Sequence, residues 1–168
     1  RSRSRASRWN VLWNEWAHDP KACDYDARMN FWGLQSLVFR TVVESGECLI
    51  RKRIEPGARF PLKLQVLEPD FLDDTRADRM TADGGYIREG VEYDANDKRI
   101  AYHMHRIHPG DRSLSIGRYE TVRVPASEVI HVFRRDRPGQ SRGVPWGAPV
   151  INRLRDFDDF SDAQLLKQ

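Results

Sequence analysis

The chain has 168 residues, the usual size of one domain, and its hydrophobic (39%) and aromatic (10%) contents exclude an intrinsically disordered protein. The 28 basic and 25 acidic side chains leave a net charge of +3, too small an excess to indicate a nucleic-acid coat. No apolar run reaches the roughly 18 residues of a membrane span, and the basic start lacks the apolar stretch of a signal peptide. We therefore expect a soluble intracellular protein without a membrane partner.

The first part of the chain predicts helices. Residues 1–7 are rich in Arg and Ser and are expected to be loose, whereas an apolar stripe at helical spacing follows them. That stripe comprises Trp9, Leu12, Trp13 and Trp16. A second helix is predicted from about Arg28 to Ser45, with Gly46 as its C-cap. Because this helix is apolar on most sides, we expect it either at the centre of the core or between subunits.

After Gly46 the hydrophobic period changes to two, which is typical of strands. Strands are predicted at 47–54, 62–68, 86–94, 99–106, 119–124 and 128–133. The polar residues 94–98 predict a hairpin. The fold class is therefore α+β: N-terminal helices, then a mainly antiparallel β-sheet or small barrel-like region, then a C-terminal amphipathic helix. Residues 1–168 are expected to form a single domain.

The last helix is predicted to begin at Pro149, a residue suited to a first helical turn. Its apolar side carries Val150, Leu154, Phe157 and Leu165, flanked by Ile151 and Phe160. The aspartates between 156 and 162 are interpreted as a solvated face rather than a metal site. Because the chain starts at Arg1 and this helical pattern runs to Gln168 without a glycine cap, we expect a fragment of something longer.

Histidines offer the strongest pattern for chemistry. His103 and His105 alternate on a predicted strand, so both imidazoles project from one face, and His108 is near. A metal-dependent hydrolase centred on this pair is one alternative function, but solvent-facing or interface histidines are favoured because no third ligand of fixed spacing is present. No phosphate loop, GxSxG elbow, HExxH or dinucleotide motif occurs. We therefore expect a protein that is not an enzyme and uses no cofactor or metal.

An arginine-rich loop is the strongest candidate for binding. Its candidate contact residues are Arg134, Arg135, Arg137, Arg142 and Trp146. Guanidinium groups can grip DNA phosphates, or they can bind acidic side chains of a neighbouring subunit such as those between 156 and 162. Subunit contact is favoured, because nonspecific DNA binding needs a denser patch. A small DNA-binding module is the second alternative function.

A second basic cluster is formed by Arg51, Lys52 and Arg53 on a predicted strand. We interpret this cluster as an edge strand protected by charge. Cys23 and Cys48 lack the spacing of a disulfide framework or zinc site, so two free thiols are expected.

Several segments in order resemble the portal proteins of lambda-like tailed phages. The most specific is the strand, Arg/Gly/Pro loop and amphipathic helix at 124–133, 134–146 and 148 onward. The Trp-rich helix and Asp/Cys turn at 13–24, the strand ending in Glu-Pro-Asp at 64–72 and the hairpin from 90 to 103 also resemble that family. Nearly the whole chain from Trp9 onward is covered.

The resemblance implies a structural subunit of a dodecameric ring at one vertex of the phage capsid. Such a ring forms the channel for DNA packaging and ejection, and its expected partners are the terminase large subunit, the major capsid and head-completion proteins, and double-stranded DNA. It implies location in the virion, and in the host cytoplasm during assembly. This chain would be the wing-like portion, without the stem, clip and crown regions.

Overall fold

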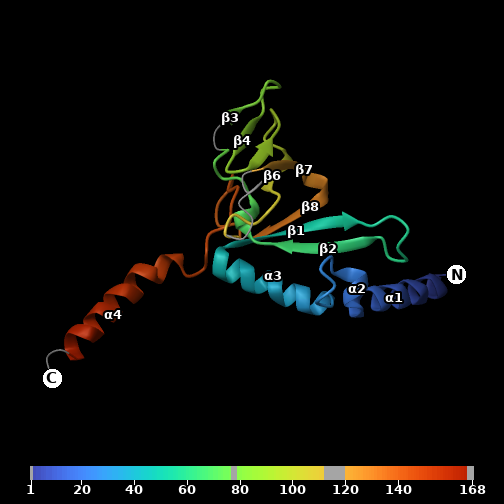
Figure 1. Ribbon diagram of the computed structural model, residues 1–168, viewed down its shortest axis with the longest axis horizontal. Coiled ribbons are helices and arrows are strands. Elements are labelled where there is room, and N and C mark those ends of the chain that lie inside the picture. Colours follow the sequence, from blue (N-terminus) through green and yellow to red (C-terminus); the bar gives the residue numbers. More distant parts are fainter. Residues whose placement is uncertain (1, 77–78, 112–119, 166–168) are drawn as a thin grey trace.

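The structure is a computed structural model that describes residues 2–76, 79–111 and 120–165 (Figure 1). Its α-helices are α1 (Ser2–His18), α2 (Pro20–Cys23), α3 (Phe31–Ser45) and α4 (Ile151–Leu165). Its strands are β1 (Glu47–Ile54), β2 (Leu62–Leu67), β3 (Arg79–Met80), β4 (Tyr86–Arg88), β5 (Val91–Tyr93), β6 (Arg99–His105), β7 (Thr121–Pro125) and β8 (Val129–Phe133). Short 3-10 turns are η1 (Pro69–Phe71), η2 (Ala126–Glu128) and η3 (Ala148–Val150).

The strands form two separate antiparallel sheets rather than a closed barrel. One sheet has the order β2-β1-β8, and the other has the order β3-β4-β5-β6-β7. The helices α2 and α3 lie along the three-stranded sheet, on the side away from the five-stranded sheet, and α1 contacts these two helices (Figure 1). The predicted α+β class, with helices at both ends and antiparallel sheets between them, is confirmed.

Two apolar clusters hold the layers together, one on each face of the three-stranded sheet. Between the sheets the buried residues are Leu49, Leu72, Val91, Tyr102, Met104, Val124 and Val129. On the helical side they are Trp16, Ala17, Ala22, Cys23 and Leu34, with Leu64 and Val66 of β2 packed against them. Burial of one large side chain contributes roughly 2 to 3 kcal/mol, so these clusters supply the main force that stacks the layers.

The helices differ from the prediction at their first residues. Residues 1–7 were expected to be loose, yet α1 already begins at Ser2, because this stretch contains neither Gly nor Pro to stop a helix. The short helix α2 was not predicted; the Asp19 side chain caps it by accepting from the Lys21 backbone N–H at 2.9 Å.

Helix α3 begins at Phe31, three residues later than predicted, because Asn30 Oδ1 accepts from the Gly33 N–H at 3.0 Å and sets the N-cap there. The predicted C-cap at Gly46 is confirmed, with a φ of +88°. Leu34 and Val42 of this helix are buried, whereas Trp32 and Phe39 are exposed. Helix α3 therefore covers one face of a sheet and is not central to the core.

The predicted single strand at 86–94 is wrong, since it is two strands joined by a tight turn. Glu89 and Gly90 both have positive φ angles, 49° and 80°, and the flanking residues Arg88 and Val91 pair with each other. This is the two-residue hairpin geometry in which both central residues are left-handed. A Cβ on Gly90 would come within 2.9 Å of the Asp73 carbonyl oxygen, so glycine is required. The hairpin predicted around 94–98 is confirmed as the β5–β6 connection.

Strand β1 is not the edge strand that its charges suggested. It pairs with β2 through residues 49–54 and with β8 through residues 47–51, so it is the central strand of its sheet up to Arg51. Only from Lys52 to Ile54 does one side lack a partner strand. The charges of Lys52 and Arg53 protect this unpaired side from pairing with another strand, whereas residues 49–51 are paired on both sides.

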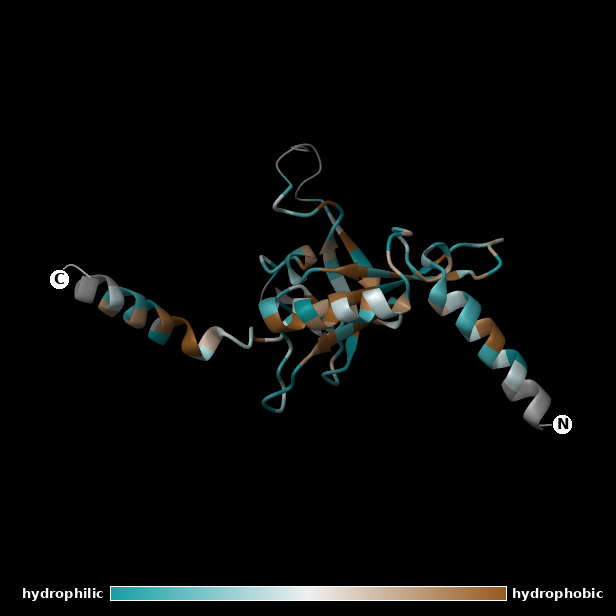
Figure 2. Ribbon diagram, turned by 90° about the horizontal axis from the view of Figure 1, so that it is seen from below, coloured by the Kyte–Doolittle hydropathy of each residue, from teal (hydrophilic) through white to brown (hydrophobic). Residues whose placement is uncertain are grey.

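Helices α1 and α4 project from opposite ends of the layered body (Figure 2). The predicted last helix is present, preceded by η3 at the predicted start. Its apolar residues Ile151, Leu154, Phe157 and Phe160 are between 59% and 68% exposed, and Asp156, Asp158 and Asp159 are exposed as well. The side chains of Asp162 and Leu165 lie outside the described residues.

Candidate functional site

The segment between β8 and η3, residues 134–147, is called the arginine loop here and carries all five predicted contact residues. It starts at the end of the three-stranded sheet, passes the β4–β5 turn and the C-terminal end of α3, and leads into α4 (Figure 1). Its shape is held by Gln140, whose Oε1 accepts from the Asp136 N–H at 2.8 Å and whose Nε2 donates to the Arg142 carbonyl at 2.8 Å. The loop is therefore an ordered structure on the surface of the body.

Arg142 anchors this loop in a buried cluster around Glu47. Arg142 Nε donates to Glu47 Oε1 at 2.5 Å, and the Gly143 N–H donates to Glu47 Oε2 at 2.6 Å. His131 Nε2 lies 2.8 Å from the same carboxylate, and the side chains of Glu47 and His131 are 2% and 0% exposed. A Cβ on Gly143 would lie 2.2 Å from the Gly46 carbonyl oxygen, so the close approach depends on glycine.

The electrostatics of this cluster favour an ionised carboxylate. Burial by itself raises the pKa of Glu47. The hydrogen bond from His131 and the charge of Arg142 outweigh that effect, so the pKa lies below its usual range. Arg142 Nη1 also donates to the Glu89 carbonyl at 3.0 Å, which ties the β4–β5 turn to the same cluster. The predicted contact residue Arg142 is thus engaged within its own chain.

Trp146 and Arg134 form a second attachment of the loop. The Trp146 ring meets Phe39 of α3 edge-on, with centroids 6.1 Å apart, and the backbone N–H of Trp146 donates to the Val43 carbonyl at 3.2 Å. The Arg134 guanidinium lies 5.6 Å from the Trp146 ring centroid and donates to Asp136 at 2.7 Å. These contacts fix the direction in which the chain enters η3 and α4.

Arg135 and Arg137 line two hollows on the surface. Arg135 shares one with Tyr86, Tyr93 and Arg99, and Arg137 shares the other with Arg88. Tyr86 and Tyr93 stack with centroids 5.0 Å apart, which gives the first hollow an aromatic wall. Of the five predicted residues, these two are placed best to meet another molecule.

Of the two histidines predicted as possible metal ligands, His103 has both ring nitrogens engaged by other side chains, whereas Nδ1 of His105 is buried without a hydrogen-bond partner. His103 Nε2 lies 2.9 Å from Glu92 Oε2, and its Nδ1 lies 3.2 Å from Arg76 Nη1, so both ring nitrogens are engaged. Arg123 donates twice to the same Glu92 carboxylate, at 2.7 and 3.0 Å. The pair of His103 and His105 therefore does not form a ligand set.

Within the described residues, one group of three has metal-ligand spacing: Glu68, Asp70 and His108. The Gly110 N–H donates to His108 Nδ1 at 3.0 Å, which places the proton of the neutral ring on Nε2. Nε2 is the atom that faces the two carboxylates, at 3.2 and 3.8 Å. In this tautomer Nε2 carries the proton and has no lone pair for a metal, and it forms no hydrogen bond to either carboxylate, so the three side chains do not make a ligand set.

Sequence reasoning missed Glu47, the residue that organises the loop. Its partner Arg142 is 95 positions away, and no local motif marks the pair. The available signal was an acidic residue at the start of a strand whose next two residues, Cys48 and Leu49, are apolar and buried.

None of the described helices is long and apolar enough to cross a membrane.

Comparison with known proteins agrees with the predicted resemblance. Residues 2–168 match the family described as phage portal protein, lambda family. The chain is also 34% identical over 144 residues to a probable portal protein of Halomonas phage phiHAP-1; the match covers 86% of this chain and 28% of the relative. The chain thus spans less than a third of that relative's length. These matches show that the chain belongs to the lambda family of phage portal proteins.

Proposed function

We propose that the chain is the wing-like portion of a portal subunit, twelve copies of which close a ring at one capsid vertex. The observation that carries this proposal is the family match over residues 2–168. Portal proteins are structural, and the proposed role is a passive conduit for double-stranded DNA during packaging and ejection. The stem, clip and crown regions would belong to other parts of the same subunit.

The proposed partners follow from that role. The ring would dock the terminase large subunit, sit among the major capsid proteins and later receive head-completion proteins. The subunit would occupy the host cytoplasm during assembly and the virion afterwards. No cofactor or catalytic residue is proposed.

The exposed surfaces of the structure support contacts between copies. Helix α4 leaves the body with its apolar residues uncovered, and at the other end α1 exposes Trp9 and Trp13 (Figure 2). Contacts between two different surfaces of the same chain close a ring when the rotation is right. Burial of several large side chains at such a contact would supply much of its binding energy.

We propose that Arg135 and Arg137 are the contact residues of the arginine loop. Their partners would be the exposed aspartates of α4 on the next copy, Asp158 and Asp159 among them. Arg142, Trp146 and Arg134 would serve by positioning the loop, because their contacts lie within the chain. A grip on DNA phosphates is disfavoured, because two arginines over separate hollows do not track a backbone.

Negative-stain electron microscopy with light scattering on the full portal subunit tests the ring. We expect closed rings with a central hole; a monomer or dimer at all concentrations would overturn the proposal. Arg135→Glu with Arg137→Glu should weaken assembly, and Asp158→Arg with Asp159→Arg should restore it in the same molecule. The control Lys21→Glu changes an exposed cation on α2, at the other end of the body, and should leave the rings intact.

A further inference from the structure

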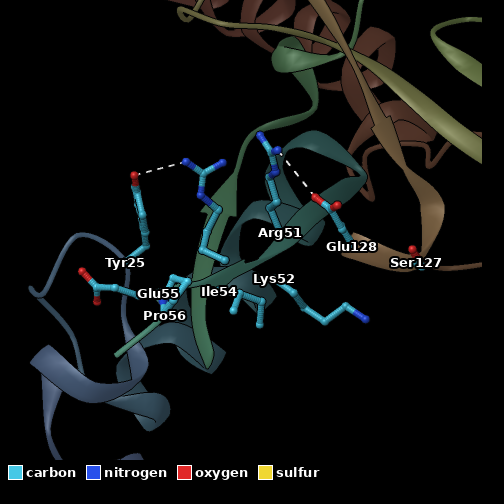
Figure 3. Close-up of a pocket in the computed structure, with 9 residues that line it drawn as sticks. Tyr25, Arg51, Lys52, Ile54, Glu55, Pro56, Ser127 and Glu128 are labelled. Carbon is cyan, nitrogen blue, oxygen red and sulfur yellow. Dashed lines mark hydrogen bonds and ion pairs between the residues drawn. The ribbon is translucent and has the colours of Figure 1, made fainter. Parts of the chain in front are cut away.

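Strand β1 directs two arginines into the space between the sheets. Alternation along the strand places Arg51 and Arg53 on the same face as Leu49, which is buried in the core between the sheets. Pairing with β8 ends at Arg51, so beyond it this face is no longer flanked by a strand on that side. Figure 3 shows Lys52 and Ile54 pointing away from the side of β1 that carries Arg51.

The result is a cleft of about 430 Å³ between the two sheets. Its basic wall is formed by Arg51 and Arg53, with Tyr25 beside them and Arg106 opposite. The rest of the lining is mostly apolar, with two polar residues, Gln65 and His105; the apolar residues are Leu67, Phe71, Met104, Val122 and Val124. A second hollow shares Tyr25, Arg51 and Arg53, so the basic wall is reached from outside.

The position of Tyr25 is fixed by the backbone around it. The Tyr25 N–H donates to the Leu64 carbonyl of β2 at 2.9 Å. The buried carboxylate of Asp24 accepts from the backbone N–H groups of Asp26, Arg28 and Met29 at 3.1, 2.9 and 3.0 Å. This turn holds the phenol beside the strand, so the cleft is a built feature and not a chance gap.

Among the described residues, the two guanidinium groups share no close carboxylate, and Arg51 alone has an ion pair, a long one. The nearest carboxylate to Arg51 is Glu128, whose Oε2 lies 3.6 Å from Nη2, beyond hydrogen-bond distance, and Arg51 Nε is buried without a partner. Arg53 donates to the neutral Tyr25 hydroxyl at 3.2 Å and stacks 4.6 Å from its ring centroid. In Figure 3 the dashed lines mark the Tyr25 contact with Arg53 and the Arg51 contact with Glu128; a second acid drawn there, Glu55, pairs with Lys63.

Arg51 shows the electrostatic cost of this arrangement. Burial lowers the pKa of its guanidinium, and the neighbouring charge of Arg53 lowers it further. A buried polar group without a hydrogen-bond partner lowers the stability of the folded protein. Such groups are often found where a ligand supplies the missing partner. An anion between the two guanidiniums would supply the missing charge.

We propose that this cleft binds a carboxylate side chain of an acidic, partly apolar segment of another protein. The guanidiniums would hold the carboxylate, and the apolar part of the lining would receive the methylene or aromatic groups next to it. Duplex DNA fits less well, because its phosphates lie on a broad convex surface and the side chain of Arg51 is only 25% exposed. The site extends beyond ring formation and does not depend on it.

The test is an NMR titration of the 168-residue chain, following the side-chain Nε–Hε signals of Arg51 and Arg53. The probe is the capped peptide Phe-Asp-Glu-Asp-Phe, and the neutral control is Phe-Asn-Gln-Asn-Phe. We expect saturable shifts with the acidic peptide at a Kd of about 1 mM or below, and none with the neutral one. Absence of saturable shifts, or equal shifts with both peptides, would overturn the proposal.

Variants and a competitor separate this site from general electrostatic attraction. Arg51→Gln with Arg53→Gln should raise the Kd of the acidic peptide at least about tenfold. Lys52→Gln, on the other face of the same strand, should change that Kd less than about twofold. Equal losses in both would assign the effect to net charge and refute the cleft. A 20-base-pair duplex that shifts the same signals at lower concentration than the peptide would assign the cleft to nucleic acid instead.

Discussion

The charged side chains at the two ends of β1 lie on the same face of the strand but differ in how well they are paired. At its start, Glu47 is 2% exposed and has three donors around its carboxylate: Arg142, His131 and the Gly143 N–H. At its end, Arg51 has a long ion pair of 3.6 Å with the half-exposed Glu128, and Arg53 donates to the neutral phenol of Tyr25. A buried charge is tolerated only when it is paired, so the first end is structural. At the second end a bound anion would add the counter-charge that the two arginines lack, which is the property expected of a binding site.

Removing the Glu47 charge is expected to have the largest effect. Glu47→Gln would leave the partly buried guanidinium of Arg142 without its counter-ion and should lower the free energy of unfolding by about 3 kcal/mol. Urea denaturation measures this loss. The matched control is Glu128→Gln at the other end of the strand, where the acid is half-exposed, and its expected change is below about 1 kcal/mol. Similar losses in both variants would erase the distinction between the two ends.

Several parts of this comparison could be predicted from sequence, and others could not. The alternating pattern correctly placed β1, β2 and β6, and Gly46 correctly marked the end of α3. These features depend on neighbours a few residues apart, where periodicity and turn chemistry act. The left-handed turn at Glu89 and Gly90 was missed because the residues around it read as one continuous strand.

The pairing of Glu47 with Arg142 could not be predicted in the same way. It depends on the arginine loop folding back across the end of α3, and a single sequence carries no local sign of that contact. The cluster 51–53 was assigned to an edge for the same reason, since the strand order β2-β1-β8 pairs residues of β1 and β8 that are 78 to 86 positions apart. Long-range pairing decided which arginines are engaged within the chain and which remain available.

Acid should weaken the paired end of β1. Because the pKa of Glu47 is lowered in the folded state, the unfolded chain binds a proton first as pH falls. The stabilisation is complete above the ordinary carboxyl pKa of about 4.3, and it is lost as pH falls through the lower folded value. Glu92 contributes in the same direction, because Arg123 and His103 lower its pKa.

Unfolding free energy measured between about pH 7 and pH 3 should therefore decline below about pH 5. The Glu47→Gln variant should show a shallower decline, because the contribution of Glu47 is then removed while that of Glu92 remains. A variant profile parallel to that of the unchanged protein would show that Glu47 carries no special pairing.

Replacement of Arg51 should have the smallest effect on stability, and its sign is informative. Arg51→Met keeps a long apolar stem, removes the buried unpartnered Nε and relieves repulsion from Arg53, so the free energy of unfolding should stay within about 1 kcal/mol or rise. Arg142→Met at the paired end should instead lower it by about 2 kcal/mol or more, because Glu47 would lose its cation. Chemical denaturation of the two variants side by side measures both changes. If Arg51→Met lowered the free energy of unfolding as much as Arg142→Met, the guanidinium of Arg51 would be needed for stability. Its presence at this position would then require no ligand as an explanation.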